Sequence, residues 1–143
     1  MLENSDILVT GASGLIGSSL LRFFSSKHHT GKIVAVSRRL PNQLLDSADY
    51  VQADLSSAKW TAELPHLKEP VIFHLAQSNR AGAFPEYAES TFAVNTSSAI
   101  PLFEFARSSN AKRVVVASTG NVYAKGDKDF YEDSPLHPND FYS

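Results

Sequence analysis

Three glycines, Gly11, Gly14 and Gly17, lie between a short apolar run and a helical stretch, within the segment Thr10–Gly17. Gly11 permits the tight turn that leaves the strand, and Gly14 permits close approach of the backbone to a pyrophosphate. Gly17 permits close packing of the helix on the strand. Amides and the positive dipole end at the start of the helix favour an anion. No lysine follows, as a nucleoside-triphosphatase loop requires. The segment predicts a dinucleotide site; a glycine-rich turn without a ligand is the alternative.

The residues after the second apolar run indicate which dinucleotide binds. An NAD site usually places a carboxylate about 20 residues beyond the glycine loop, where it binds the ribose 2′-hydroxyl. Here the chain reads Ser37-Arg38-Arg39, and no acid follows until Asp46. Guanidinium groups match a 2′-phosphate, which a carboxylate would repel. We therefore expect NADP(H), with NAD as the less favoured cofactor and two solvated arginines as the alternative.

Short apolar runs alternate with helical stretches, which is the pattern of βαβ units around a parallel sheet. The runs are continuous rather than alternating, as expected for strands covered on both faces. We predict an α/β fold, a Rossmann-type doubly wound parallel sheet with about five strands, formed by residues 1–143 as one dinucleotide-binding domain. The predicted strands are Ile7–Val9, Ile33–Val36, Tyr50–Gln52, Val71–Leu75 and Val114–Ala117.

Helices are predicted at Leu15–Ser26, at Ala58–Leu64 and at Phe84–Ser109. Pro101 should kink or split the last one, because proline lacks the amide donor of an interior turn. In that helix we expect an apolar stripe widened by two flanking residues, so that it buries one face on the sheet and one on a partner, or is wholly internal. The stripe comprises Phe92, Ala99, Phe103 and Ala106, with Leu102 and Phe105 beside it.

Composition excludes several classes of protein. The net charge of −2, with both signs spread through the chain, gives no basic footprint for nucleic acid. No cysteine is present, and the histidines lack ligand spacing, so neither a disulfide nor a metal site is expected. Residues 1–6 do not resemble a signal peptide, and no apolar run approaches the roughly 20 residues that span a bilayer. A cytoplasmic location without membrane contact is expected.

Together with the glycine loop, four later segments resemble the extended short-chain dehydrogenase/reductase family, in particular its NAD-dependent epimerase/dehydratase group. The glycine loop is similar to the family's Thr-Gly-x-x-Gly-x-x-Gly fingerprint. The order and spacing of the segments match the family over nearly the whole chain. The segments are Ala53-Asp54-Leu55, His74-Leu75-Ala76-Gln77, Val94-Asn95 and Ala117-Ser118-Thr119-Gly120-Asn121-Val122-Tyr123.

The resemblance implies roles for particular residues. Asp54 would contact the adenine edge, although it could instead cap a helix. Thr119 would be the catalytic hydroxyl that holds the substrate oxygen, or merely cap the end of a strand, and Tyr142 would be the catalytic tyrosine. His74 is read as a hydrogen-bonded residue at a strand end. The expected cofactor contacts are Gly11, Ser13, Gly14, Leu15, Ile16, Gly17, Ser37, Arg38, Arg39, Asp54, Leu55, Leu75, Ala76, Gln77 and Asn95.

The family's Tyr-x-x-x-Lys motif would place a lysine three residues beyond Ser143. A free phenol has a pKa of about 10, so Tyr142 alone would stay largely protonated at neutral pH. Without the lysine, this chain alone is expected to be inactive. We expect a truncated chain that lacks the substrate-binding region. Apolar surface beside the fifth strand and the long helix should then be uncovered and favour a homodimer or other self-association.

These observations leave more than one function open. The first is the NADP(H)-binding portion of an epimerase, dehydratase or reductase that acts on a hydroxyl or keto group of a small-molecule substrate, such as a nucleotide sugar. The alternative is a non-catalytic module that senses NADP(H) and needs neither Tyr142 nor the lysine. A structural fragment that binds nothing is a third, minor reading. Titration with both cofactors separates the third reading from the other two.

Overall fold

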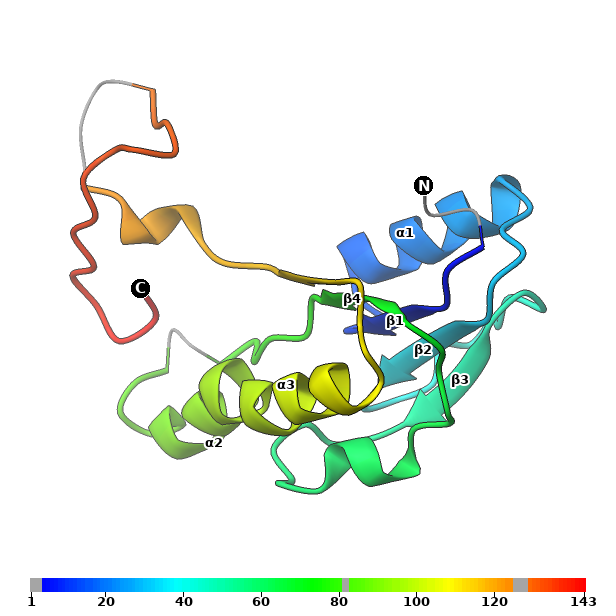
Figure 1. The fold of residues 1–143 in the computed structure, drawn as a ribbon. Coiled ribbons are helices and arrows are strands. Elements are labelled where there is room, and N and C mark those ends of the chain that lie inside the picture. Colours follow the sequence, from blue (N-terminus) through cyan, green and yellow to red (C-terminus); the bar gives the residue numbers. More distant parts are fainter. Residues whose placement is uncertain (1–3, 81–82, 125–128) are drawn as a thin grey trace.

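The computed structural model describes residues 4–80, 83–124 and 129–143, and its core is a sheet of five parallel strands (Figure 1). The spatial order is β3-β2-β1-β4-β5, so the chain moves outward to one side of β1 and then crosses to the other. This confirms the predicted doubly wound parallel sheet, and each strand lies within a residue or two of its expected place. The strands are β1 (Ile7–Thr10), β2 (Ile33–Ser37), β3 (Asp49–Gln52), β4 (Val71–His74) and β5 (Arg113–Val116).

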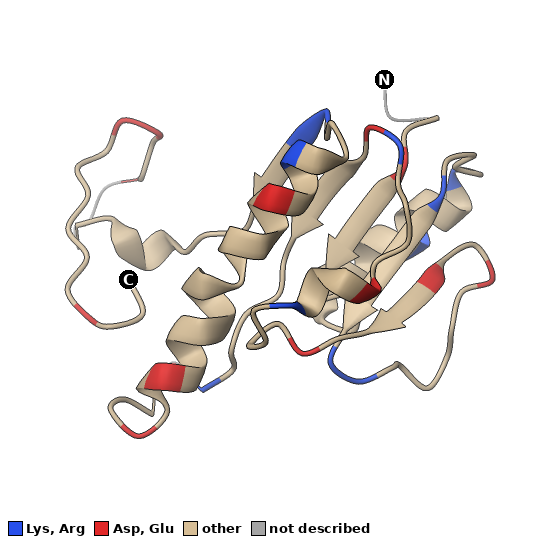
Figure 2. Ribbon diagram, turned by 60° about the horizontal axis from the view of Figure 1, so that its bottom comes forward, with Lys and Arg blue, Asp and Glu red and all other residues tan. Residues whose placement is uncertain are grey.

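The central strands β1, β2 and β4 contain no charged residue and are drawn entirely in tan in Figure 2. Their side chains alternate between two apolar layers, one on each face of the sheet. Ile7 and Val9 pack on the face covered by α1 (Leu15–Ser26). Leu8 and Ile72 pack on the opposite face, against Leu102. Continuous apolar runs are thus needed because both faces are buried.

Helix α1 has the bounds that the sequence predicts, but its buried face is narrower. Leu21 and Phe24 are buried against the sheet, whereas Leu15, Ile16 and Phe23 are exposed. Leu15 and Ile16 instead stand at the start of the helix, beside the pocket described below.

The predicted long helix Phe84–Ser109 is three consecutive segments, α2 (Ala88–Phe92), the π-helical turn η2 (Ala93–Ser97) and α3 (Ala99–Ser108). The expected start at Phe84 is wrong, since a residue before proline disfavours the helical region and Pro85 follows. The helix is split, as expected, but before Pro101 and not at it, by the π turn that ends at Ser97. Ser97 is the residue four positions back, whose carbonyl would have accepted from an amide at position 101, and proline has no such amide.

The predicted apolar stripe is wrong for Phe92 and Phe103 and right for Ala106. Phe92 and Phe103 are 54% and 51% exposed, and Ile100 is 74% exposed, whereas Leu102 and Ala106 are buried. The Ser98 amide donates to the Ala93 carbonyl five residues back, so the π turn holds one extra residue and rotates the downstream helix by about 100°. The helix is therefore not wholly internal in the described structure.

Elements outside the main layers are short. The expected helix Ala58–Leu64 is a single 3₁₀ turn, η1 (Trp60–Glu63), whose buried Trp60 packs in the α3 layer. A second 3₁₀ turn, η3 (Gly120–Val122), follows β5. The polar tail predicted from Lys125 onward is irregular over residues 129–143, apart from an isolated bridge of Leu136 to Tyr123, and residues 125–128 lie outside the described structure.

Strand β5 is an edge of the sheet, and Val115 and Val116 on it are exposed. The sequence predicted uncovered apolar surface at this strand and at the long helix, and both are observed. Among the described residues, no helix combines the length and the apolar character that crossing a bilayer requires.

Candidate functional site

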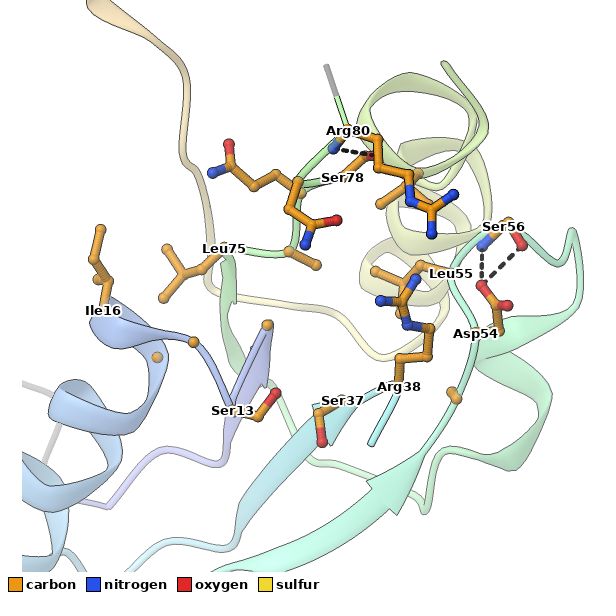
Figure 3. A pocket seen from close by; sticks show the side chains of 18 of the residues that line it. Ser13, Ile16, Ser37, Arg38, Asp54, Leu55, Ser56, Leu75, Ser78 and Arg80 are labelled. Carbon is orange, nitrogen blue, oxygen red and sulfur yellow. Dashed lines mark hydrogen bonds between the residues drawn. The ribbon is translucent and has the colours of Figure 1, made fainter. Parts of the chain in front are cut away.

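A pocket of about 820 Å³ lies at the carboxyl ends of the parallel strands (Figure 3). Its walls come from the glycine loop after β1, from the loops after β2, β3 and β4, and from the α2–η2 segment. Open α/β sheets bind ligands at this edge, where the strand order reverses and neighbouring loops separate. Here the reversal falls at β1, between β2 and β4.

The glycine loop has the geometry that the sequence predicts for two of its three glycines. Gly11 has φ +70°, and a Cβ there would lie 2.7 Å from the Ala76 amide nitrogen. A Cβ on Gly17 would lie 2.3 Å from the Gly11 carbonyl oxygen, so helix and strand contact closely. Gly14 is less crowded, because a Cβ there would meet only the Gly11 carbonyl oxygen, at 3.2 Å. All three glycines border the pocket.

The start of α1 has the features of an anion site. Gly14 is the N-cap residue and has no side chain to satisfy the first amides, and the first turn contains no acidic residue. The helix dipole and unpaired amides at this end therefore face the pocket without a competing carboxylate. Ser13, Leu15 and Ile16 border the same opening.

At the end of β2, Arg38 extends into the pocket (Figure 3), whereas Arg39 is not among the residues that line it. Ser37 is buried, and its hydroxyl donates to the Arg39 carbonyl at 2.9 Å, which holds the turn. No ion pair involves Arg38 in the described structure. Its guanidinium is therefore available to a ligand.

Asp54 follows β3 and lines the same side of the pocket. Its Oδ1 accepts from the Ser56 amide at 2.9 Å and from the Ser56 hydroxyl at 2.8 Å. These two bonds, and more weakly the charge of Arg38, lower the pKa of Asp54, so the carboxylate is ionised at neutral pH. The proposed helix cap is wrong, since the next helical turn begins only at Trp60; Asp54 instead closes a local turn. Its neighbour Leu55 is buried in the core and also borders the pocket.

The loop after β4 is held by a buried hydrogen-bond chain. The Thr10 hydroxyl accepts from the Leu75 and Ala76 amides at 3.2 and 3.3 Å and lies 2.8 Å from His74 Nδ1. On the other side of the ring, Nε2 lies 3.2 Å from Ser98 Oγ, which donates to the Val94 carbonyl. A neutral ring that donates from Nε2 satisfies every partner, and burial lowers the pKa of His74 accordingly. The prediction of a hydrogen-bonded strand-end histidine is confirmed.

Asn95 and Gln77 contact this loop and the tail rather than each other. Asn95 Oδ1 accepts from the Ser78 amide at 2.7 Å, so Asn95 fixes the loop backbone and does not itself line the pocket. Gln77 does line the pocket, and its Oε1 accepts from the Tyr142 hydroxyl at 2.7 Å. The tail thus returns to the site through Tyr142.

Thr119 and Tyr142, the two residues expected to be catalytic, form no hydrogen bond with each other in the described structure. The Thr119 hydroxyl accepts from the Asn121 amide at 3.2 Å and caps η3, so a capping role is observed for it, though on a helical turn and not on a strand. No hydrogen bond links the hydroxyls of Thr119 and Tyr142 among the described residues, and neither borders the pocket.

Arg80 is the main pocket residue that sequence reasoning missed. It lies on the loop after β4, and its guanidinium carbon stands 4.2 Å from the centre of the Tyr87 ring. The sequence did contain a signal for Arg80, because the residue follows the end of β4 by six positions. In a parallel sheet, the loop after that strand lies at the edge where the pocket forms. Ser90 and Val94 also border the pocket, from α2 and η2.

The described residues contain no group of three histidine, aspartate or glutamate side chains that could hold a metal ion. The pocket is bordered by backbone amides, the guanidinium groups of Arg38 and Arg80, several hydroxyls, the side-chain amide of Gln77 and the carboxylate of Asp54. Such a donor set suits a phosphate-containing organic ligand.

Comparisons with known proteins agree with this geometry. The chain is 32% identical over 95% of its length to UDP-glucose 4-epimerase of Mycolicibacterium smegmatis, of which it covers 46%. The fold is similar to the ADP-L-glycero-D-manno-heptose-6-epimerase of Helicobacter pylori, with a TM-score of 0.79, 25% identity, and coverage of 99% of this chain and 47% of that one. It is also similar to MoeE5 in complex with UDP-glucose and NAD, with a TM-score of 0.75, 31% identity, and coverage of 96% and 44%.

The chain thus spans about half the length of the relatives that it matches. A family model described as the NAD dependent epimerase/dehydratase family matches residues 7–143, which is almost the entire sequence. The glycine turn, the strand order and the pocket position are those expected of an NAD-binding Rossmann domain. This chain belongs to the NAD dependent epimerase/dehydratase family.

Proposed function

We propose that residues 1–143 form one dinucleotide-binding domain, the NADP(H)-binding part of an epimerase, dehydratase or reductase. The substrate would be a small molecule with a reacting hydroxyl or keto group, and a nucleotide sugar is the class we favour. Support comes from the similarity to a UDP-glucose 4-epimerase and to a protein whose structure holds UDP-glucose and NAD. Because the chain spans about half of these relatives, the activity of the whole protein is part of the proposal.

The residues of the pocket fit a dinucleotide. The amides at the start of α1 would hold the pyrophosphate, since Gly14 leaves them accessible and no acid lies in the first turn. The loops after β3 and β4 would enclose the adenosine and the nicotinamide ribose, in which Asp54 and Gln77 contribute polar atoms.

The preference for NADP(H) depends on one observation, the position of Arg38. Its side chain extends into the pocket from the end of β2 and forms no ion pair among the described residues, where an NAD site would usually have a carboxylate. Arg38 would bind the 2′-phosphate as a bidentate donor. Ser37 and Arg39 would contribute through the turn that the Ser37 hydroxyl closes.

The chemistry would use two hydroxyls of this chain. The bound nicotinamide would supply hydride transfer to or from the reacting carbon of the substrate. Tyr142 would take the proton of the substrate hydroxyl, and Thr119 would hold the same oxygen. The Tyr142–Gln77 hydrogen bond, at 2.7 Å, supports this role because it brings the phenol to a side chain that lines the pocket.

Titration of the chain with NADPH and with NADH tests the proposal. NADPH should bind more tightly, and Arg38→Ala should remove most of that preference while affecting NADH little. Arg22→Ala is the matched control, because Arg22 lies on α1, is exposed and does not border the pocket. Equal losses for both cofactors in Arg38→Ala would refute the 2′-phosphate assignment, and failure to bind either would refute the proposed function of this chain.

A further inference from the structure

Two arginines from different loops meet at one end of the pocket. Arg38 follows β2 and Arg80 follows β4, and both border the cavity. Figure 3 shows their side chains extending toward one another from opposite sides, with Leu55 beside them. Neither takes part in an ion pair within the described residues. Two guanidinium groups directed into one cavity repel each other unless an anion lies between them.

Arg80 is held in this position by its surroundings. Its amide donates to Ser78 Oγ at 3.2 Å, and the Ser78 amide donates to Asn95 Oδ1 at 2.7 Å, so the loop is fixed to the helical layer. The guanidinium lies over the Tyr87 ring, at 4.2 Å from its centre. Stacking on a ring face leaves the edge N–H groups free for a planar acceptor, and it reduces the freedom lost on binding.

Asp54, the one carboxylate that borders the pocket among the described residues, offsets the charge of the pair only in part. Its charge interacts weakly with that of Arg38, but its Oδ1 accepts from the amide and hydroxyl of Ser56, and no ion pair joins it to either arginine in the described structure. Two guanidinium groups against one carboxylate leave a net positive charge at this end of the pocket for a ligand. The proposed pyrophosphate donors are at the start of α1, where Ile16 lies across the pocket from Arg38 in Figure 3.

We infer that Arg80 is a second anion-binding residue, which together with Arg38 binds the phosphate on the adenosine 2′-oxygen and so determines cofactor specificity. The inference rests on the proposed function, which needs Arg38 alone. A phosphate monoester offers three terminal oxygens, enough to accept from two guanidinium groups at once.

Binding of two fragments isolates this contact, because adenosine 2′,5′-bisphosphate and adenosine 5′-monophosphate differ only in the 2′-phosphate. Affinities of the chain for each are measured by calorimetry in the unchanged protein and in Arg80→Ala, Arg80→Lys, Arg38→Ala and the control Arg22→Ala. Arg80 and Arg38 are exposed, so the variants should fold, and circular dichroism checks this. Arg80→Ala should weaken the bisphosphate about tenfold, equivalent to about 1.4 kcal/mol, and leave the monophosphate nearly unchanged. Arg80→Lys should recover part of the loss.

The outcomes separate the inference from the proposed function. If only Arg38→Ala weakens the bisphosphate, the role of Arg80 is refuted and the NADP(H) proposal stands. If Arg80→Ala weakens both fragments equally, Arg80 contacts the adenosine and the inference is wrong. If the unchanged chain binds both fragments equally well, the NADP(H) preference itself fails and the role of Arg80 fails with it.

Discussion

Replacing Gly17 by alanine should destabilise the fold, whereas replacing Gly14 by alanine should leave the fold stable and weaken dinucleotide binding. Gly14 is the N-cap of α1 and Gly17 lies in its first turn, so they are close in sequence, but their surroundings differ. A Cβ on Gly17 would meet the Gly11 carbonyl oxygen at 2.3 Å and the Ala12 Cα at 2.9 Å, both of which are backbone atoms that no side-chain rotation can move. A Cβ on Gly14 would meet only the Gly11 oxygen, at 3.2 Å.

The cost of each change follows from these distances. The Cβ on Gly17 falls 0.7 Å short of the 3.0 Å that real Cβ contacts require, so α1 would have to move away from β1. Because only backbone atoms are in the way, we place the cost of overpacking at the upper end of its usual range, about 3 kcal/mol, of which alanine's better helix propensity offsets about 1 kcal/mol. At about 2–4 °C per kcal/mol for a chain of this size, the remaining cost of about 2 kcal/mol should lower the midpoint of thermal unfolding by roughly 4–8 °C.

Gly14→Ala needs a shift of only a few tenths of an ångström, and the φ of −77° suits alanine, so its stability should change by less than about 1 kcal/mol. Its methyl group would stand in the pocket where we place the pyrophosphate. NADPH affinity should fall by about tenfold or more, which is about 1.4 kcal/mol.

Thermal unfolding followed by circular dichroism, and cofactor titration by fluorescence, measure the two effects separately. Gly120→Ala is the matched control, because a Cβ there meets nothing within 4 Å. If Gly17→Ala unfolds at the same temperature as the unchanged chain, the packing argument is wrong. If Gly14→Ala binds both cofactors normally, the glycine loop is not the pyrophosphate site.

Two further predictions concern His74 and the outer face of the helices. Burial lowers the pKa of His74, so the folded chain favours the neutral imidazole more than the unfolded chain does. The stability that the neutral imidazole contributes should therefore be complete above pH 6.5, the ordinary pKa of histidine, and should decline as the pH falls below that value. Urea unfolding at several pH values should show this decline, by at most about 1.4 kcal/mol per pH unit, and an equally steep dependence of stability on pH in His74→Gln would contradict it. The second prediction is that Ile100→Asp and Phe103→Glu reduce self-association, measured by light scattering at high concentration. The unfolding temperature should not change, since both side chains are exposed, and an unchanged chain that is already monomeric would contradict this prediction.

The parts of the fold that sequence could predict are those in which one force dominates. The short, β-branched apolar runs that contain Ile7, Ile33 and Val71 favour buried strands, and glycine at position 11 fits a positive φ that most other residues avoid. The position of Arg38 in the pocket follows in the same way from the end of β2.

Sequence reasoning failed where a choice depended on contacts distant along the chain. Apolar residues occupy most of the circumference of α3, so the local pattern does not decide between the neighbours Leu102 and Phe103, of which only Leu102 is buried. Arg80 was missed because its direction depends on Tyr87 and on the Ser78–Asn95 contact, not on any local pattern.

The rotation of α3 is fixed by the burial of Leu102 and Ala106 and by polar contacts at its N-terminal end, at Ser98. Its carbonyl accepts from Trp60 Nε1 at 3.1 Å, its hydroxyl lies 3.2 Å from His74, and its amide closes the π turn. The exposed aromatic residues of α3 do not orient the helix, so substitutions at these positions should leave its orientation unchanged. Deleting one residue from the segment 93–97 would instead turn every downstream side chain away from its neighbours at once. Natural variation in this region should therefore consist of substitutions, with length changes confined to the loops on either side.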